Sequence, residues 1–147
     1  MDPMYLLEHV ASLLAKQSDQ VLQEQLGIGV AQFKILQVLQ NEPRTTQREI
    51  AVQLGQTEAS ISRQVKLMLA EGLLQSIRSP KDHREHITSV TPKGERLAQA
   101  ATAALERYHR PTFQGLHERQ QEQLQTTLTL LHDQLCLAVH TPANARR

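Results

Sequence analysis

Aromatic residues and cysteine are scarce in this chain of 147 residues. It has no Trp, two Tyr, two Phe and one Cys, Cys136. A chain with one cysteine cannot form an internal disulfide, so noncovalent packing must hold the fold together. The core must be aliphatic, and because Gly is rare while Leu, Ala and Gln are abundant, the composition favours helices over strands.

Long apolar runs are also missing. No stretch approaches the roughly 18 residues that a membrane-spanning helix needs. The first residues, Met1-Asp2-Pro3-Met4, have no basic segment leading into an apolar one, as a secretory signal would. We therefore expect a cytoplasmic protein without a membrane partner.

The motifs of common enzymes are absent as well. The sequence has no Gly-rich phosphate loop, no H-E-x-x-H and no nucleophile elbow. These absences predict that the chain is not an enzyme and needs no cofactor.

Neither metal nor redox sensing is well supported by the sequence. The seven His include no pair four residues apart on one predicted helix, and there is no Cys-x-x-Cys. Glu106 and His109, three residues apart, are the best pair of ligands, and we predict no metal site. Cys136 stands between Leu135 and Leu137, which predicts a core or interface residue rather than a reactive thiol.

Basic side chains are concentrated in the middle of the chain. Residues 44–96 carry nine basic and six acidic side chains, a net of +3, whereas residues 1–43 carry two and five, a net of −3. A basic segment is a weak indication of a phosphate-bearing partner, because solvated helix faces often produce the same imbalance.

Residues 46–71 have the pattern of a helix-turn-helix. Thr46 and Glu49 form a capping box that starts a short helix, and Gly55 predicts a tight turn after about two helical turns. Thr57 then predicts the start of a second helix, residues 58–71, which would bury Ile61, Val65 and Met68.

The outer face of that second helix has the composition of a major-groove reader. Small residues permit close approach, hydroxyls can bond phosphates or base edges, and Arg can make a bidentate contact to guanine. The same pattern also fits an ordinary pair of antiparallel helices. The face would consist of Ala59, Ser60, Ser62, Arg63 and Lys66.

A β-hairpin is expected directly after this pair of helices. Residues 73–78 and 86–90 are short segments with β-branched residues, separated by a polar stretch. A basic tip in this place suits a wing that lies along the DNA backbone or enters a narrow minor groove. Arg84 is the main candidate, flanked by Lys81 and His83, and Asp82 could pair with its guanidinium. A solvated turn with incidental charges is the alternative.

The two ends of the chain are predicted to be helical. Apolar residues repeat at helical spacing over residues 4–26, and a helix over residues 30–39 should turn Phe33, Leu36 and Leu39 inward. After the hairpin, Thr91-Pro92 starts a helix that we expect to end near His109, before Pro111. The last helix, residues 117–139, has a seam spaced by four and three residues: Leu124, Leu128, Leu131, Leu135 and Ala138.

These outer helices expose more apolar surface than a small central domain needs. A second copy of the chain would bury it, or the helices could pack on their own subunit. The sequence predicts three regions: an N-terminal dimerisation helix (1–29), a DNA-binding domain (30–96), and C-terminal dimerisation helices with a frayed tail (97–147). The candidate dimerisation residues are Leu7, Val10, Leu14, Leu124, Leu128, Leu131 and Leu135.

Over about residues 43–97 the sequence resembles the MarR family of winged helix-turn-helix regulators. Residues 46–55 resemble its first motif helix, and Ser60-Ile61-Ser62-Arg63-x-Val65 resembles its recognition helix. The wing signature appears as Asp82-His83-Arg84 followed by Thr91-x-x-Gly94. Ser76 and Ile77 depart from an often basic wing strand, and Glu58 would repel phosphate.

The resemblance implies a mainly α fold with a small β-hairpin wing, and a homodimer on a pseudo-palindromic operator. It implies repression that a small-molecule effector or oxidation often relieves, with Ser60, Ser62 and Arg63 facing DNA and Arg84 reaching the minor groove. The candidate DNA contacts are Thr46, Thr57, Ala59, Ser60, Ser62, Arg63, Lys66, Arg78, Lys81 and Arg84. The weaker candidates for an effector site are His9, Leu13, Phe33, Gln37 and Tyr108. The competing interpretation is a winged-helix dimer that acts through protein contacts without DNA.

Overall fold

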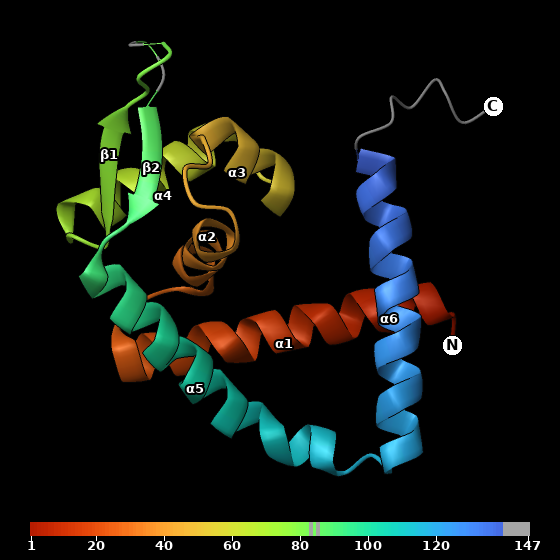
Figure 1. Ribbon diagram of the computed structural model, residues 1–147. Helices are drawn as coiled ribbons and strands as arrows, with labels where there is room; N and C mark the ends of the chain where they lie inside the picture. Colours follow the sequence, from red (N-terminus) through yellow and green to blue (C-terminus); the bar gives the residue numbers. More distant parts are fainter. Residues whose placement is uncertain (83, 85, 140–147) are drawn as a thin grey trace. The chain divides into compact units, whose positions relative to one another are not determined.

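The computed structural model describes residues 1–82, 84 and 86–139 and is mainly helical, with one β-hairpin (Figure 1). In chain order the elements are α1 (Pro3–Leu26), α2 (Val30–Asn41), α3 (Gln47–Leu54), α4 (Glu58–Ala70), β1 (Leu74–Arg78), β2 (His86–Val90), α5 (Pro92–Gln114) and α6 (Glu118–Val139). This is the winged-helix architecture that the sequence predicts. The chain divides into two compact units, Met1–Tyr108 and His109–Arg147, with the boundary inside α5.

Local signals in the sequence set the helix ends of the first unit. Asp2 caps α1 by accepting a hydrogen bond from the backbone N–H of Met4, and Pro3 occupies the first turn, where its missing N–H costs nothing. Gly27 ends α1 in the left-handed conformation, with a φ of 68°. The helix boundaries near residues 26 and 30 are therefore those expected from the sequence.

One aliphatic core joins α2, α3, α4, β1 and α5. Ile35, Leu36, Ile50, Val65 and Met68 are fully or almost fully buried in it, and Ala98 brings α5 against the same cluster. Burial of this apolar surface supplies the main driving force for folding the unit. Because the core lies behind α3 and α4, it holds both helices in place while their other faces stay free.

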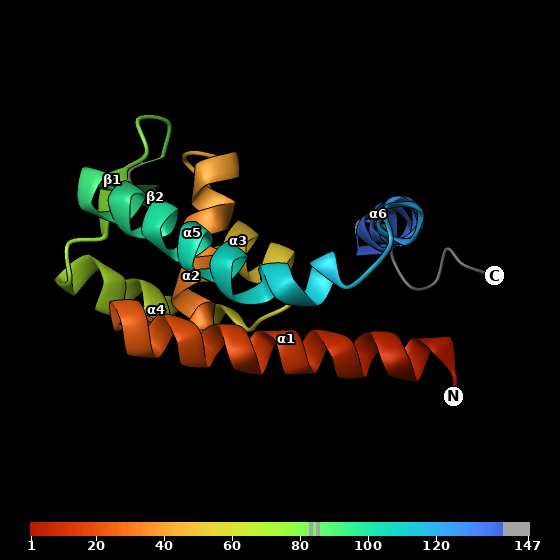
Figure 2. The same cartoon turned by 90° about the horizontal axis from the view of Figure 1, so that it is seen from below.

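A second, smaller cluster connects the end of α1 to α2 and α5. It contains Leu22, Ile28, Phe33 and Ala101, all at most 4% exposed. The N-terminal half of α1 extends beyond the other helices of its unit (Figure 2). Its apolar residues Met4, Tyr5, Leu6, Leu7 and Val10 are consequently exposed.

Helix α5 corrects one expectation. It continues through Pro111 to Gln114 instead of ending near His109. Proline removes the hydrogen bond to the carbonyl four residues earlier, but its fixed φ is helical, so the following turn can continue. The helix ends only at Gly115, whose N–H donates to the Pro111 carbonyl at 3.2 Å.

Helix α6 makes up most of the second unit. Within its described side chains, none is buried. Its start is capped by the Gln120 side chain, which accepts a hydrogen bond from the His117 N–H at 2.9 Å. Across the described part of the chain, every helix is too short or too polar to cross a bilayer.

Candidate nucleic-acid interface

Helices α3 and α4 form a helix-turn-helix with the predicted local chemistry. The capping box is present: Thr46 accepts from the Glu49 N–H at 3.2 Å, and the Glu49 carboxylate accepts from the Thr46 N–H at 2.8 Å. Gly55 closes α3 with a φ of 61°, and the Gln56 N–H donates to the Ala51 carbonyl at 3.0 Å. The turn between the two helices is thus fixed by backbone hydrogen bonds.

Helix α4 begins where Thr57 predicts it. The Thr57 hydroxyl accepts from the Ser60 N–H at 3.1 Å, and the Ser60 hydroxyl donates to the Gln56 side-chain oxygen at 3.4 Å. Ser60 is half-buried beside the turn, so its hydroxyl is already engaged in the free chain. A DNA contact by Ser60 would have to share or replace that bond.

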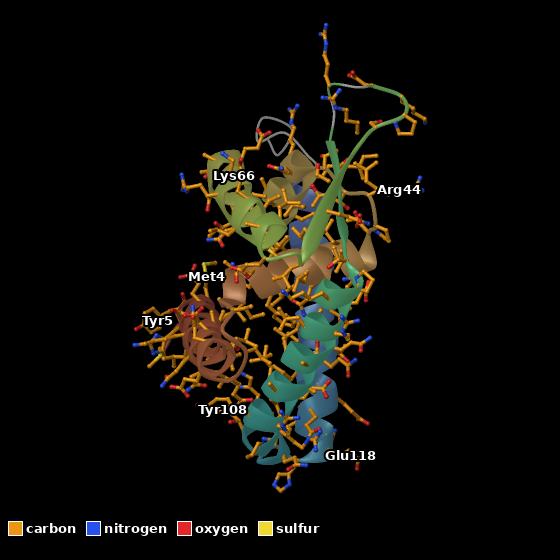
Figure 3. The ribbon with its side chains drawn as sticks, turned by 90° about the vertical axis from the view of Figure 1, so that its left-hand side faces the viewer. Met4, Tyr5, Arg44, Lys66, Tyr108 and Glu118 are labelled. Atoms are coloured by element: carbon orange, nitrogen blue, oxygen red, sulfur yellow. The ribbon has the colours of Figure 1, made fainter. Side chains whose placement is uncertain are left out.

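The two faces of α4 differ as expected. Ile61, Val65 and Met68 are buried, whereas Ala59, Arg63 and Lys66 are exposed along one side of the helix. Ser62 is half-buried at the edge of that side. Figure 3 shows Lys66 on the free side of α4. We call Ala59, Ser62, Arg63 and Lys66 the α4 face.

The basic residues of this region carry uncompensated charge. Among the described residues, the one contact within ion-pair distance is that of His132 with Asp133 on α6, so none involves Arg63, Lys66, Arg78, Lys81 or Arg84. An unpaired, exposed Arg or Lys keeps its donors available for an anionic ligand. The helix-turn-helix and the hairpin therefore present free donors together.

The hairpin has the register Leu74↔Val90 to Arg78↔His86, with antiparallel strands. Its base is tied to the end of α4: the Thr91 hydroxyl donates to the Gly72 carbonyl at 2.6 Å, and the Thr91 N–H donates to the Leu73 carbonyl at 3.1 Å. The Lys93 ammonium donates to the Glu71 carbonyl at 2.7 Å. These bonds fix the base of the wing relative to α4, a role that sequence reasoning did not assign to Thr91 or Lys93.

Close packing around residue 94 explains why the Thr91-x-x-Gly94 pattern ends in glycine. A Cβ atom at this position would stand 2.2 Å from the Leu73 carbonyl oxygen and 2.7 Å from Val90 Cγ1. The N-terminus of α5 can therefore lie this close to the base of the hairpin only without a side chain at residue 94.

The tip of the wing corrects the expected role of Asp82. Its carboxylate accepts a hydrogen bond from the backbone N–H of Arg84 at 3.0 Å and forms no ion pair with the guanidinium. Asp82 therefore shapes the turn and leaves the exposed Arg84 side chain unpaired. His83 lies outside the described residues.

One exposed basic residue near the motif was missed. Arg44, in the connection between α2 and α3, has a φ of 71°, the one positive φ outside glycine among the described residues. In Figure 3 it lies on the opposite side of the hairpin from Lys66. Because Gly and Asn are the residues that usually adopt a positive φ, the sequence did not predict this conformation at Arg44.

The structure places the five effector-site candidates in different surroundings. Phe33 is buried in the second core cluster, whereas His9 is exposed and stacks on Tyr5, with ring centroids 5.8 Å apart. Gln37 lines an open polar groove with Lys34, Asn41 and Gln53. Leu13 and Tyr108 are exposed elsewhere on the unit. Phe33 is thus a core residue in this structure, and no effector site follows from the other four.

The candidate dimerisation residues are largely exposed in the single chain. Leu7 and Val10 on α1 and Leu124, Leu128, Leu131 and Leu135 on α6 are each at least 38% exposed, and Leu14 is half-buried. Cys136 is also exposed, so of the predicted core or interface position the core alternative is wrong, and the interface alternative stays a prediction. Among the described residues, no group of three or more side chains could hold a metal ion. Glu106 and His109 are therefore not part of such a group.

Comparisons with known proteins agree with this geometry. Residues 26–85 match the model of the MarR family. The regulator BilQ of Clostridium symbiosum, described as an HTH-type transcriptional regulator, is 29% identical over 108 residues, 74% of each chain. Wild-type MarR from E. coli superposes with a TM-score of 0.80 at 18% identity, over 89% of this chain and 97% of that one. A mutant of S. aureus MepR bound to an oligodeoxyribonucleotide gives a TM-score of 0.61 at 25% identity, over 92% and 99%.

Proposed function

We propose that the chain is a transcriptional regulator of the MarR family that binds operator DNA through α4 and the wing, because residues 26–85 match the model of that family and the chain is similar to an HTH-type regulator over 74% of its length. The observation that carries this proposal is the α4 face. Arg63 and Lys66 are exposed there, form no ion pair, and stand on a helix whose opposite side is buried. The DNA-bound MepR relative supports the same use of the fold.

The α4 face has the chemistry of direct readout. A guanidinium can donate two hydrogen bonds to O6 and N7 of guanine, and a small residue such as Ala59 lets the helix approach the bases. Lys66 is suited to a backbone phosphate, which fixes register without reading sequence. Thr46 and Thr57, at the first turns of α3 and α4, lie where helix N-termini accept phosphate.

The wing supplies a second contact. Arg84 is exposed and unpaired at its tip, with Lys81 and Arg78 in the same hairpin. We assign Arg84 to the minor groove, where a narrow A·T-rich segment has enhanced negative potential. Its reach depends on the bonds of Thr91 and Lys93 that fix the base of the hairpin.

We further propose a homodimer on a pseudo-palindromic operator, with one α4 in each half-site. The exposed leucines of α1 and α6 support this, because large apolar faces on a soluble chain usually mark an interface. By resemblance to the family, the dimer would act as a repressor that a small-molecule effector releases.

Fluorescence anisotropy with duplexes tiled across the promoter nearest the gene tests the proposal. Scrambled duplexes and a salt series are the controls, since phosphate contacts make affinity salt-dependent. We expect tight binding of one near-palindromic duplex at two chains per duplex. If no duplex is preferred over scrambled DNA at any salt, a dimer that acts through protein contacts becomes the better interpretation.

A further inference from the structure

A cluster of polar side chains stands near the end of α6, away from the proposed DNA-binding elements in sequence. His132 and Cys136 are four residues apart, and Cys136 Sγ lies 3.4 Å from His132 Nε2. The other ring nitrogen, His132 Nδ1, lies 3.2 Å from Asp133 Oδ1. All three side chains are exposed, His132 at 72% and Asp133 at 66%.

Imidazole nitrogen and thiolate sulfur are the donors that Zn²⁺ and other thiophilic cations prefer. Positions four residues apart lie on one side of a helix, the spacing that lets the two His of H-E-x-x-H hold one zinc ion. With Zn–S and Zn–N bonds of about 2.3 and 2.0–2.1 Å, two ligands of a tetrahedral ion are about 3.6 Å apart. The observed 3.4 Å separation is close to that value.

Asp133 has the position of a supporting carboxylate. A metal-ligating His almost always donates its other N–H to such a group, which fixes the tautomer and the ring orientation. Here the Nδ1 proton would go to Asp133, leaving the lone pair of Nε2 directed toward the sulfur side. The carboxylate is thus a positioning group, and Nε2 and Sγ are the two donors.

The two donors differ in their position relative to the leucine seam of the same helix. His132 follows Leu128 by four residues, so it lies about 40° around the helix from that leucine and borders the seam, whereas Cys136 is rotated by about 80° or more from every seam leucine. Formation of the proposed dimer through the seam leaves Cys136, in particular, outside the row of leucines.

We propose that His132 and Cys136 form a two-donor site for a thiophilic divalent cation, with Zn²⁺ as the natural candidate. Binding releases the thiol proton to solvent, forms the metal–sulfur and metal–nitrogen bonds, and leaves the remaining positions to water. Because both donors are exposed, the metal exchanges freely with solution. The site is independent of the proposed function, since it needs no DNA.

The test uses reduced, full-length protein without an affinity tag. Co²⁺ serves as the spectroscopic probe, because a thiolate ligand gives a charge-transfer band in the near ultraviolet, and Zn²⁺ is then titrated in to displace it. We expect one Co²⁺ per chain, loss of the band in Cys136→Ser, and at least tenfold weaker binding in His132→Ala. Asp133→Asn should weaken binding by up to about tenfold, the lower end for a supporting group.

The matched control is His117→Ala, which removes an exposed imidazole from the same unit and should leave both affinities unchanged. Far-ultraviolet circular dichroism checks that every variant keeps its helix content. The proposal is overturned if wild type shows no charge-transfer band, or if the double variant of His132 and Cys136 binds Zn²⁺ as tightly as wild type.

Discussion

Gly94 is a single residue on which the relation between two elements depends. It lets the first turn of α5 lie against the Leu73 carbonyl, and the Thr91 hydroxyl accepts a hydrogen bond from its N–H at 3.1 Å. The requirement is steric, because its φ is not in the left-handed region that favours glycine elsewhere. It is therefore a stronger constraint than Gly27 or Gly55, whose missing Cβ would meet open space.

We expect Gly94→Ala to lower the free energy of unfolding by about 3 kcal/mol or more, the upper range for overpacking, because the nearest atom is a backbone carbonyl. Urea denaturation measures it. The control is Gly29→Ala, where the nearest atoms, Asp19 Oδ1 at 3.2 Å and Gln23 Nε2 at 3.4 Å, end flexible side chains. Equal stability of the two variants would contradict the steric role of Gly94.

Arg84 carries the prediction for the wing. Replacement by alanine removes an exposed, unpaired guanidinium, so Arg84→Ala should weaken operator binding at least tenfold, about 1.4 kcal/mol or more, without altering the dimer. Anisotropy at one fixed salt concentration measures it. Arg107→Ala, which removes an equal charge from α5, should bind as wild type does. Equal affinity for Arg84→Ala and wild type would rule out the wing contact.

At the scale of single residues, the sequence predicted which basic residues are exposed better than it predicted the hydrogen-bond partners of the polar side chains. Arg63 and Lys66 could be placed on the outer face from helical periodicity alone. The hydrogen bond from the Arg84 N–H to Asp82 could not be predicted, because the short side chain of Asp can accept from several donors in a turn. The pairing of His132 with Cys136 was missed because the patterns that predict metal ligands here were pairs of His, Glu with His, and Cys-x-x-Cys, and none of them includes a His with a Cys.

Among the elements, α3 shows how strongly local chemistry can specify a helix. Its capping box, its eight residues and its glycine end all follow from short-range signals. A helix this short is unstable alone, so its packing through Ile50 and Ala51 supplies the rest.

Thr46→Ala should therefore cost about 1 kcal/mol of stability, the usual value for a lost N-cap. The Glu49 N–H loses its acceptor, and Ala cannot replace it. Chemical denaturation of the variant beside Arg48→Ala, an exposed truncation two residues further along the same helix, measures the effect. If both variants are as stable as wild type, the cap is not contributing.

Element ends were predicted less well where competing signals met. Pro111 usually marks a helix end, yet α5 continues for three residues beyond it. The lost hydrogen bond is local, and the residues after a proline retain their helical preference. Periodicity alone could not decide between these two effects.

For the whole molecule, the apolar surface of the outer helices is the main feature. The seam leucines of α6 are exposed in the single chain, although their spacing by four and three residues is that of a helix-packing seam. The sequence therefore predicted the seam, whereas its partner surface cannot be derived from one chain.

We predict that Leu128→Glu or Leu131→Glu dissociates the dimer, because each buries a charge in an apolar interface. Sedimentation velocity measures the mass. Leu130→Glu is the matched control, since Leu130 is 61% exposed and stands off the seam, so its dimer should persist. Dimers of normal stability in all three variants would show that the interface lies elsewhere.

The central claim is that α4 reads the operator, and Arg63 tests it most directly. The measurement is the affinity of wild type and Arg63→Ala for the preferred duplex and for a scrambled one, by anisotropy at one salt concentration. Loss of a base contact predicts an operator affinity reduced about 5- to 150-fold, or 1–3 kcal/mol, with a smaller change on scrambled DNA. If Arg63→Ala keeps both the affinity and the preference of wild type, α4 does not read the operator through this face.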